Sequence, residues 1–380
     1  MKIKDEKVSI PPALLVVIED AGWWSGFDRF CNNEPYRTGM NRMHCPEDYL
    51  AIVRLASLLK TQILAGFVLC EWDRNDLLRE LPSATWMGKQ WRCPMKSSFL
   101  LNKAAKILND NLNYIKIGMH GVGHEYWKNG VVSRTEFHNE SGKMRSREEV
   151  IKHIEMFSKL LEASGINALF PEIYIPPALR HSFGNGRHGF QQILSDYGIS
   201  YVITVFAKAR QYSEPLYPEI TQECGVTIIE RGVSPVCWND ISASPQFSFK
   251  QTIIPLHWAN ILSQNPEYNG DVVDRWADFL LKGVKENGFI LLPKVSSTIS
   301  QIIFHKLARI EPFQEGVCID ISAVRRVFPK GIKKGCYLKV PVESRNITVT
   351  GAQVKPAVAN NVKGILKLIP SDSDIVRITF

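Results

Sequence analysis

The chain of 380 residues lacks the patterns that mark several common protein classes. Its eight cysteines include no Cys-x-x-Cys pair, which argues against a zinc ribbon. It has no lysine–arginine run and no module that interleaves basic with aromatic residues, so nucleic acid is not an expected partner. It also has no internal repeat and no low-complexity tract.

A long hydrophobic run is missing as well. The first apolar run, at residues 11–18, has only about eight residues and ends in two acids, which fits neither a signal peptide nor a transmembrane segment. The chain is therefore expected to stay in the cytoplasm with its thiols reduced. The sequence gives no indication of the oligomeric state.

The composition is that of a globular protein with a large core. Hydrophobic residues make up 45% of the chain and charged residues 22%, which suits one large domain with a small one. The net charge of +8, from 46 basic and 38 acidic residues, is modest. It suits an acidic glycan, a nucleotide-sugar or an anionic membrane surface, and equally an ordinary solvated surface.

Strand-like and helix-like patterns alternate through most of the chain, which predicts an α/β fold with a parallel sheet or barrel. The expected helices span residues 47–60, 98–111, 146–164, 189–197, 272–287 and 298–308. The expected strands span residues 11–18, 63–70, 114–119, 172–175, 201–206, 226–230, 252–256 and 289–292. After about residue 310, short strand-like runs separated by glycine and proline predict a small all-β, sandwich-like module. The expected domains are thus residues 1–310 and 311–380.

Two histidines and two acids form the most informative pattern. His120 and His124 follow one strand-like run, and Glu19 and Asp20 follow another. Two imidazoles four residues apart can grip one divalent ion, and a single carboxylate would complete a site that is open to water and substrate. Glycines between the histidines oppose the helix of a His-Glu-x-x-His protease. An iron oxygenase triad ranks low because the acid lies a whole strand–helix unit upstream.

These motifs resemble those of the polysaccharide deacetylase family, carbohydrate esterase family four. Glu19 and Asp20 match its first motif, although the family usually has aspartate at the first position. His120 and His124 match the second motif, without its hydroxyl residue, and His257 in Pro-Leu-His matches the last. The resemblance covers roughly residues 10–308 and implies a distorted (β/α) barrel of seven or eight strands.

Two family motifs are incomplete. Residues 175–177, Ile-Pro-Pro, keep the prolines of the third motif without its arginine, and no Asp-Trp motif follows residues 201–206. Arg180 is a candidate for the missing arginine. Aromatic residues beside the proposed site are candidates for stacking on a sugar ring. The expected substrate-binding residues are Trp23, Trp24, Pro177, Arg180 and Trp258.

The resemblance also implies roles for the site residues. Asp20, His120 and His124 would hold one divalent ion, with zinc expected. Glu19 would be the catalytic base and His257 the catalytic acid. The implied function is a metal-dependent hydrolase that removes an N- or O-acetyl group from an acetylated sugar, a nucleotide-sugar or a lipid-linked glycan. Two alternatives stay open: a non-catalytic glycan-binding protein on a decayed barrel, and a metal-dependent hydrolase of another C–N bond.

Overall fold

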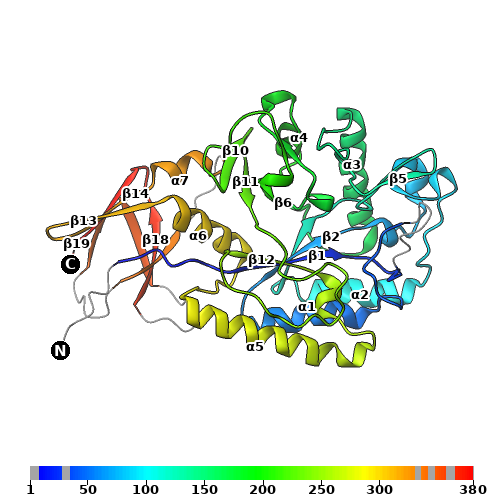
Figure 1. Cartoon of the computed structure of the whole chain (residues 1–380), viewed down its shortest axis with the longest axis horizontal. Helices are drawn as coiled ribbons and strands as arrows, with labels where there is room; N and C mark the ends of the chain where they lie inside the picture. Colours follow the sequence, from blue (N-terminus) through cyan, green and yellow to red (C-terminus); the bar gives the residue numbers. More distant parts are fainter. Residues whose placement is uncertain (1–7, 28–34, 330–334, 341–346, 357–363, 380) are drawn as a thin grey trace.

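The computed structural model describes residues 8–27, 35–329, 335–340, 347–356 and 364–379. Its centre is an eight-stranded sheet in the order β10-β11-β8-β6-β3-β2-β1-β12 (Figure 1). All neighbours in this sheet are parallel except β10 and β11. The strands are β1 (Leu15–Ala21), β2 (Ile63–Phe67), β3 (Ile115–Met119), β6 (Ile173–Tyr174), β8 (Tyr201–Thr204), β10 (Ile220–Glu223), β11 (Val226–Glu230) and β12 (Ile253–His257). The predicted mixed α/β fold with a large parallel sheet is therefore confirmed.

The apolar strands of this sheet are buried on both faces, as is usual for parallel strands covered on each side. In β1, Val16 and Ile18 belong to one hydrophobic core, whereas Leu15 and Val17 belong to another. The first core contains side chains from helices α1 to α5, and the second contains side chains from α6, α7 and the C-terminal strands. The alternation along β1 thus joins the two cores through the sheet.

The helices lie close to the ranges that the sequence predicts. The acidic first turn of the helix predicted at residues 146–164 forms a capping box, in which Ser146 and Glu149 each accept a hydrogen bond from the other's backbone. No described helix is long and apolar enough to span a bilayer. The helices are α1 (Pro46–Leu59), α2 (Ser98–Asp110), α3 (Arg147–Ser164), α4 (Phe190–Asp196), α5 (Asn269–Asn287), α6 (Val295–Leu307) and α7 (Ser322–Val327).

Two small antiparallel sheets follow α6 and lie at one end of the molecule (Figure 1). The C-terminal part of the chain is not all-β as predicted, because the short helix α7 lies between the strands of these sheets in the sequence. The first sheet has the order β13-β14-β19-β16 and the second β15-β18-β17. Their strands are β13 (Arg309–Phe313), β14 (Gly316–Asp320), β15 (Cys336–Lys339), β16 (Thr348–Thr350), β17 (Ala352–Pro356), β18 (Ile365–Pro370) and β19 (Ile375–Thr379).

The C-terminal sheets attach near the amino end of β1. Ser9 forms a bridge with Lys339, and the Gln301 amide donates to the carbonyl oxygens of Pro11 and Tyr337. The second core crosses residue 310, where the sequence predicts a domain boundary. That boundary remains a prediction. The polar side chains at the carboxyl end of β1 lie at the other end of this strand from the C-terminal sheets.

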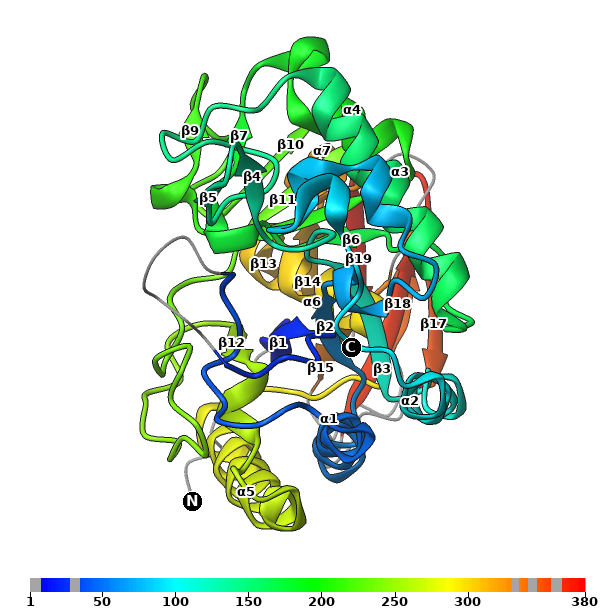
Figure 2. The ribbon, with the colours of Figure 1, turned by 90° about the vertical axis from the view of Figure 1, so that its right-hand side faces the viewer.

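The large sheet is strongly curled, although its edge strands β10 and β12 form no ladder with each other in the described part of the chain. Strands β1 and β11 lie five positions apart in the sheet. In a flat sheet their ends would be separated by about 24 Å. Nevertheless Glu19, at the end of β1, contacts Arg231, directly after β11, at 2.6 Å. The sheet therefore wraps around the space above its strand ends (Figure 2).

The strand predicted at residues 289–292 is not formed. Ile290 makes only an isolated bridge with Ala13, before β1 begins. Pro12, directly before this bridge, has no backbone N–H to extend the ladder backward, and from Val17 onward β1 pairs with β2 instead. Shorter two-stranded pairs lie outside the main sheet. They are β4 (Tyr126–Lys128) with β5 (Val131–Ser133), and β7 (Ser182–Phe183) with β9 (Arg210–Gln211).

A buried carboxylate fastens α1 to the start of α5. Asp48, in the first turn of α1, accepts hydrogen bonds from both terminal nitrogens of Arg42 at 2.7 and 2.8 Å. It is also 3.0 Å from His44 Nδ1 and accepts from the Asn269 amide at 2.9 Å. Burial opposes its ionisation, but His44 and Arg42 hold the pKa of Asp48 well below its usual range.

We expect Asp48→Asn to lower the free energy of unfolding by about 2 kcal/mol at neutral pH, because it leaves the half-buried Arg42 without its counter-charge. The lowered pKa sets the sign of the pH dependence. The stabilisation is complete above the unfolded-state pKa of roughly 4 and is lost as the pH falls below it. Urea unfolding between neutral and acidic pH would measure both effects. The exposed Asp274→Asn is the control, and equal losses in the two variants would contradict this account.

Candidate metal centre

Polar side chains gather where the parallel strands β1, β3, β11 and β12 end, which is where such sheets place ligand sites. Glu19 and His257 are register partners on the neighbouring strands β1 and β12. The pairing of β1 with β2 shifts register between Ile18 and Ala21. Asp20 lies within that shift and adopts a φ of +63°. As a result, the adjacent acids Glu19 and Asp20 both line one cavity instead of opposite faces of the sheet.

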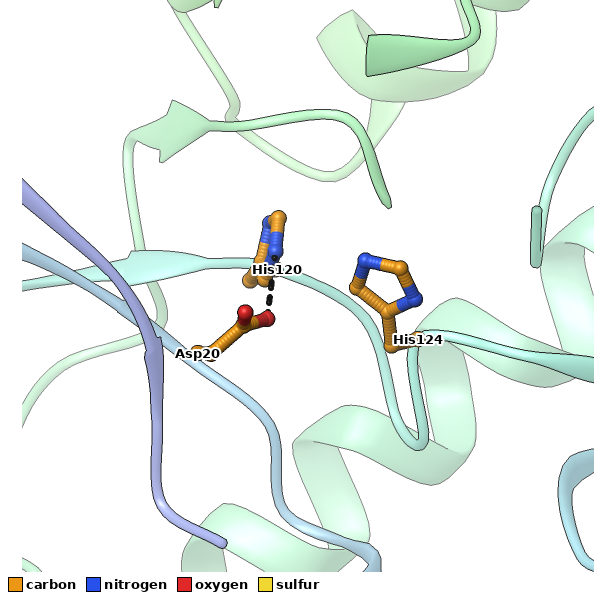
Figure 3. A group of neighbouring side chains, drawn as sticks. All are labelled: Asp20, His120 and His124. Carbon is orange, nitrogen blue, oxygen red and sulfur yellow. Dashed lines mark ion pairs between the residues drawn. The ribbon is translucent and has the colours of Figure 1, made fainter. Parts of the chain in front are cut away.

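Asp20, His120 and His124 point toward one another (Figure 3). Each offers one ligand atom, and these atoms lie within 4.8 Å of one another. The Asp20 Oδ1 atom is 3.3 Å from His120 Nε2, and the two imidazole rings are 5.0 Å apart. The predicted cluster of one carboxylate and two imidazoles is thus brought together, from the end of β1 and from both ends of the turn after β3.

The chemistry of these side chains fits a divalent ion. His120 Nδ1 is 2.8 Å from the Ile175 carbonyl oxygen, which makes Nδ1 a donor and directs Nε2 toward Asp20; burial lowers the pKa of His120, but the Asp20 carboxylate raises it overall. Burial lowers the pKa of His124 to about 3, so its imidazole is neutral. Burial opposes ionisation of Asp20, but its contact with His120 holds the pKa of Asp20 below the usual range. Neutral imidazole and ionised carboxylate are the forms that bind metal.

Backbone strain concentrates around this cluster. Asp20, His124, Ala178 and Leu179 all have positive φ values, of +63°, +64°, +49° and +59°. Residues other than glycine rarely adopt positive φ values, and such backbone strain often marks functional sites. One consequence is that the Ala178 N–H is turned toward the cluster and donates to His124 Nε2 at 3.2 Å.

Glu19 lies between a cation and an imidazole. Arg231 Nη1 donates to Glu19 Oε1 at 2.6 Å, and both side chains are almost fully buried. On its other side, Glu19 Oε2 is 3.7 Å from His257 Nε2. Burial lowers the pKa of His257, although the charges of Glu19 and Asp20 oppose that shift. Arg231 is thus the buried counter-charge of the Glu19 carboxylate.

A second buried carboxylate holds the turn between the two histidines. Glu136 accepts from the backbone N–H groups of Val122 and Gly123 at 2.9 and 3.2 Å, and it lies 2.8 Å from His153 Nδ1. A Cβ atom at Gly121 would come within 2.2 Å of Glu136 Oε2. The carboxylate thus fills the space beside Gly121, where the family motif has a hydroxyl residue.

The cavity beside the cluster has a volume of about 370 Å³. Glu19, Asp20, His124, Arg231 and His257 line it. Among the described residues, Trp238 is the one tryptophan in the cavity wall, to which Val205 and Val233 also contribute.

Three of the predicted sugar-stacking residues lie elsewhere. Trp23, Trp24 and Trp258 are in the hydrophobic core and are absent from the cavity wall. Their rings pack on other side chains: Trp24 on Tyr49 and Trp72, and Trp258 on Tyr49 and His44. The prediction that these indoles line the pocket is therefore wrong.

Pro177 and Arg180 are also absent from the cavity wall, to which the intervening Ala178 and Leu179 contribute. The arginine that contacts Glu19 is Arg231, whereas Arg180 was the candidate for the missing motif arginine. The position of Arg231 directly after a predicted strand was a usable signal, since the same rule identified Glu19 and His120. Glu136 and Trp238 lie in irregular segments, and no pattern in the sequence marks them.

No family model matches the sequence, and no curated protein matches it. Solved structures with a related fold include a Mycobacterium smegmatis protein assigned to the polysaccharide deacetylases, at 12% identity and a TM-score of 0.39, covering 70% of this chain and 82% of that one. A family 4 carbohydrate esterase from Streptomyces lividans in complex with acetate has 9% identity and a TM-score of 0.34, covering 71% and 88%. A 4-alpha-glucanotransferase from Thermococcus litoralis has 11% identity and a TM-score of 0.40, covering 76% and 40%.

Polysaccharide deacetylases are thus among the solved structures that resemble the chain, as the motifs predict. Structural similarity of this degree does not show the activity, because a protein of a different class resembles the chain equally well. The activity has to be inferred from the residues of the site.

We expect Glu136→Gln to weaken zinc binding by roughly 10- to 100-fold, the usual effect of removing a residue that orients metal ligands. The amide keeps the size of the side chain but has one acceptor oxygen for two backbone N–H groups. Competition with a chelating dye would measure the affinity, and circular dichroism would verify the fold. Glu140→Gln, at an exposed position nearby, is the control. Unchanged zinc affinity in Glu136→Gln would show that other contacts hold the turn.

Proposed function

We propose that this protein is a metal-dependent deacetylase that removes an N- or O-acetyl group from a sugar or glycan precursor. One observation carries the proposal: a cluster of Asp20, His120 and His124 borders the same cavity as a buried carboxylate, Glu19, and an imidazole, His257. A ligand set, a base and an acid around one cavity are the parts that hydrolysis of an acetyl group requires.

Asp20, His120 and His124 would hold the ion, and zinc suits two imidazoles and one carboxylate. When bound, such an ion supplies Lewis acidity toward a water molecule and the acetyl carbonyl oxygen. The turn held by Glu136 keeps His124 opposite Asp20, and the hydrogen bond to Ile175 keeps His120 in the required tautomer.

Glu19 is the proposed general base. Its carboxylate is buried, is paired with Arg231, and lines the cavity beside Asp20. It would accept the proton of the attacking water. Arg231 is a positioning residue, because its contact with Oε1 at 2.6 Å orients the carboxylate and leaves Oε2 facing His257.

His257 is the proposed general acid, which would donate a proton to the leaving amine or hydroxyl group of the sugar. It lines the cavity at the end of β12, and the Asn260 side chain accepts from its backbone N–H at 2.7 Å. The Ala178 N–H is the proposed donor to the developing oxyanion. It now donates to His124 Nε2 at 3.2 Å, so it would be available to that oxygen only when the proposed ion takes the Nε2 lone pair.

Asp20 and Glu19 are adjacent but have different proposed roles, so amide substitutions should separate them. Asp20→Asn should lower zinc affinity, because a neutral amide is a poorer ligand, while asparagine tolerates the positive φ as aspartate does. Glu19→Gln should retain zinc and lose about 10²- to 10⁴-fold in turnover, the usual contribution of a general base. Elemental analysis would measure the metal, and acetate release from acetylated sugars would measure turnover.

Glu19→Gln also leaves Arg231 buried without a counter-charge, so thermal unfolding must accompany the assay. Glu19→Asp keeps the charge and shortens the side chain, and it should restore the fold with partial activity. The exposed Asp110→Asn serves as the control. Loss of zinc in Glu19→Gln with retention in Asp20→Asn would reverse the two roles, and an effect of neither variant on metal or turnover would refute the deacetylase proposal.

A further inference from the structure

A second cavity, of about 580 Å³, lies beside the hairpin that β4 and β5 form. Among the described residues, none lines both this second cavity and the cavity beside the proposed metal cluster. Its walls come from residues 80–88, from residues 126–130 and from the first two turns of α3. Strand β4 packs against the helical turn Pro82–Ala84, so the first two of these walls are in contact. A cavity of this size can hold a small ligand.

Partly buried apolar side chains form one wall of the second cavity. Trp86 is half-buried, and Met87 is 41% exposed. The Arg37 guanidinium carbon lies 4.9 Å from the centre of the Trp86 ring, and the Trp91 ring meets Trp86 at 5.0 Å and 89°. These contacts hold the Trp86 ring in place at the cavity, where part of it stays accessible. Aromatic surface that is held in place and left partly exposed is typical of a binding site.

The hairpin forms another wall. Asn129 and Gly130 make its two-residue turn with φ values of +52° and +75°, as in the tightest β-hairpins. On β4, the Trp127 indole N–H donates to Glu125 Oε2 at 3.2 Å, which fastens the hairpin to the segment that follows His124. The hairpin therefore presents the Asn129 amide, which can both donate and accept hydrogen bonds, on a fixed backbone at the cavity.

The hydroxyl group of Thr85 lacks a hydrogen-bond partner within the part of the chain that the structure describes. Thr85 is only 1% exposed, and it lines the second cavity. Buried hydroxyl groups normally have a partner, because leaving one unpaired destabilises the folded protein. A ligand that carries hydroxyl groups would supply that partner from the cavity.

The charges around the second cavity balance. Two carboxylates and two ammonium groups line it, from Glu80, Glu149, Lys128 and Lys152. Lys152 Nζ is also paired with Glu148 on α3 at 2.6 Å. Equal numbers of opposite charges give no net attraction for an anion or a cation. The ligand that fits these walls is therefore uncharged.

An uncharged ligand for these walls needs an apolar face and several hydroxyl groups. A sugar ring has both, since C–H groups cover its faces and hydroxyl groups surround its edge. We propose that the second cavity binds a neutral sugar residue of a glycan, with its ring against Trp86 and Met87 and its hydroxyl groups within reach of Thr85 and Asn129. This inference goes beyond the proposed deacetylase activity and does not depend on it.

The test is isothermal titration calorimetry of the full chain with cellotetraose, maltotetraose and mannotetraose. These oligosaccharides are neutral and carry no acetyl group, so the proposed activity cannot consume them. At least one should bind with a Kd below about 1 mM. Its affinity should change by less than about twofold between low and high salt, because the cavity carries no net charge.

Variants of two lining residues locate the binding. Trp86→Ala should weaken binding of that oligosaccharide by roughly tenfold, and Trp86→Phe should restore part of the loss because it keeps an aromatic face. Thr85→Val keeps the shape without the hydroxyl group, so it should weaken binding roughly two- to tenfold. It should not lower the thermal stability, since that hydroxyl has no partner to lose. Val131→Ala, at an exposed position on β5 outside the cavity wall, is the control.

Failure of all three oligosaccharides to bind would overturn the inference, and so would an affinity that falls steeply with salt. Wild-type affinity in both Trp86→Ala and Thr85→Val would overturn it as well. Circular dichroism verifies the fold, and Thr85→Val decides alone if Trp86→Ala does not fold. The deacetylase proposal is tested separately, by zinc content and acetate release. A chain without either that still loses oligosaccharide binding in these variants would contradict the proposed function and retain the sugar site.

Discussion

The buried ion pair between Glu19 and Arg231 is the contact on which the architecture of the site depends. It joins the ends of β1 and β11, strands that lie five positions apart in the sheet, at a distance of 2.6 Å. Such a contact requires a curled sheet, and the curl brings the other strand ends around the same cavity. A buried ion pair stabilises a protein only when both partners are present. The contact therefore helps to hold the sheet curled, and the curled sheet in turn brings Arg231 to Glu19.

The turn after β3, which carries His120 and His124, is held in place by a side chain from outside the turn. Its two histidines must face Asp20 from opposite ends of a short glycine-rich segment, and Gly121 leaves no side chain to hold that segment. Glu136 occupies the vacated space and binds two backbone N–H groups. The space beside Gly121, where the motif has a hydroxyl residue, is thus filled by the Glu136 carboxylate from further along the chain.

Strand-end reasoning predicted the candidate site well because its rule is local. A buried run that stops at a polar residue marks Asp20, His120 and His257, and it would also have marked Arg231. Residues that depend on tertiary packing were beyond it, since Glu136 meets the turn only after folding. The aromatic residues failed for the opposite reason: adjacency in sequence suggested that Trp23, Trp24 and Trp258 line the pocket, but burial of their large apolar rings directs them into the core. The strand at residues 289–292 failed because Pro12 cannot extend its pairing backward and β2 pairs with β1 from Val17 onward.

The central claim is that Asp20, His120 and His124 bind one divalent ion. X-ray absorption spectroscopy at the zinc edge, on the full chain loaded with zinc, tests it most directly. The account predicts a first shell of nitrogen and oxygen ligands at about 2.0–2.1 Å, with imidazole scattering from two histidines. One imidazole contribution should disappear in His124→Ala. Sulfur ligands, an all-oxygen shell, or a spectrum unchanged in both His120→Ala and His124→Ala would contradict the account.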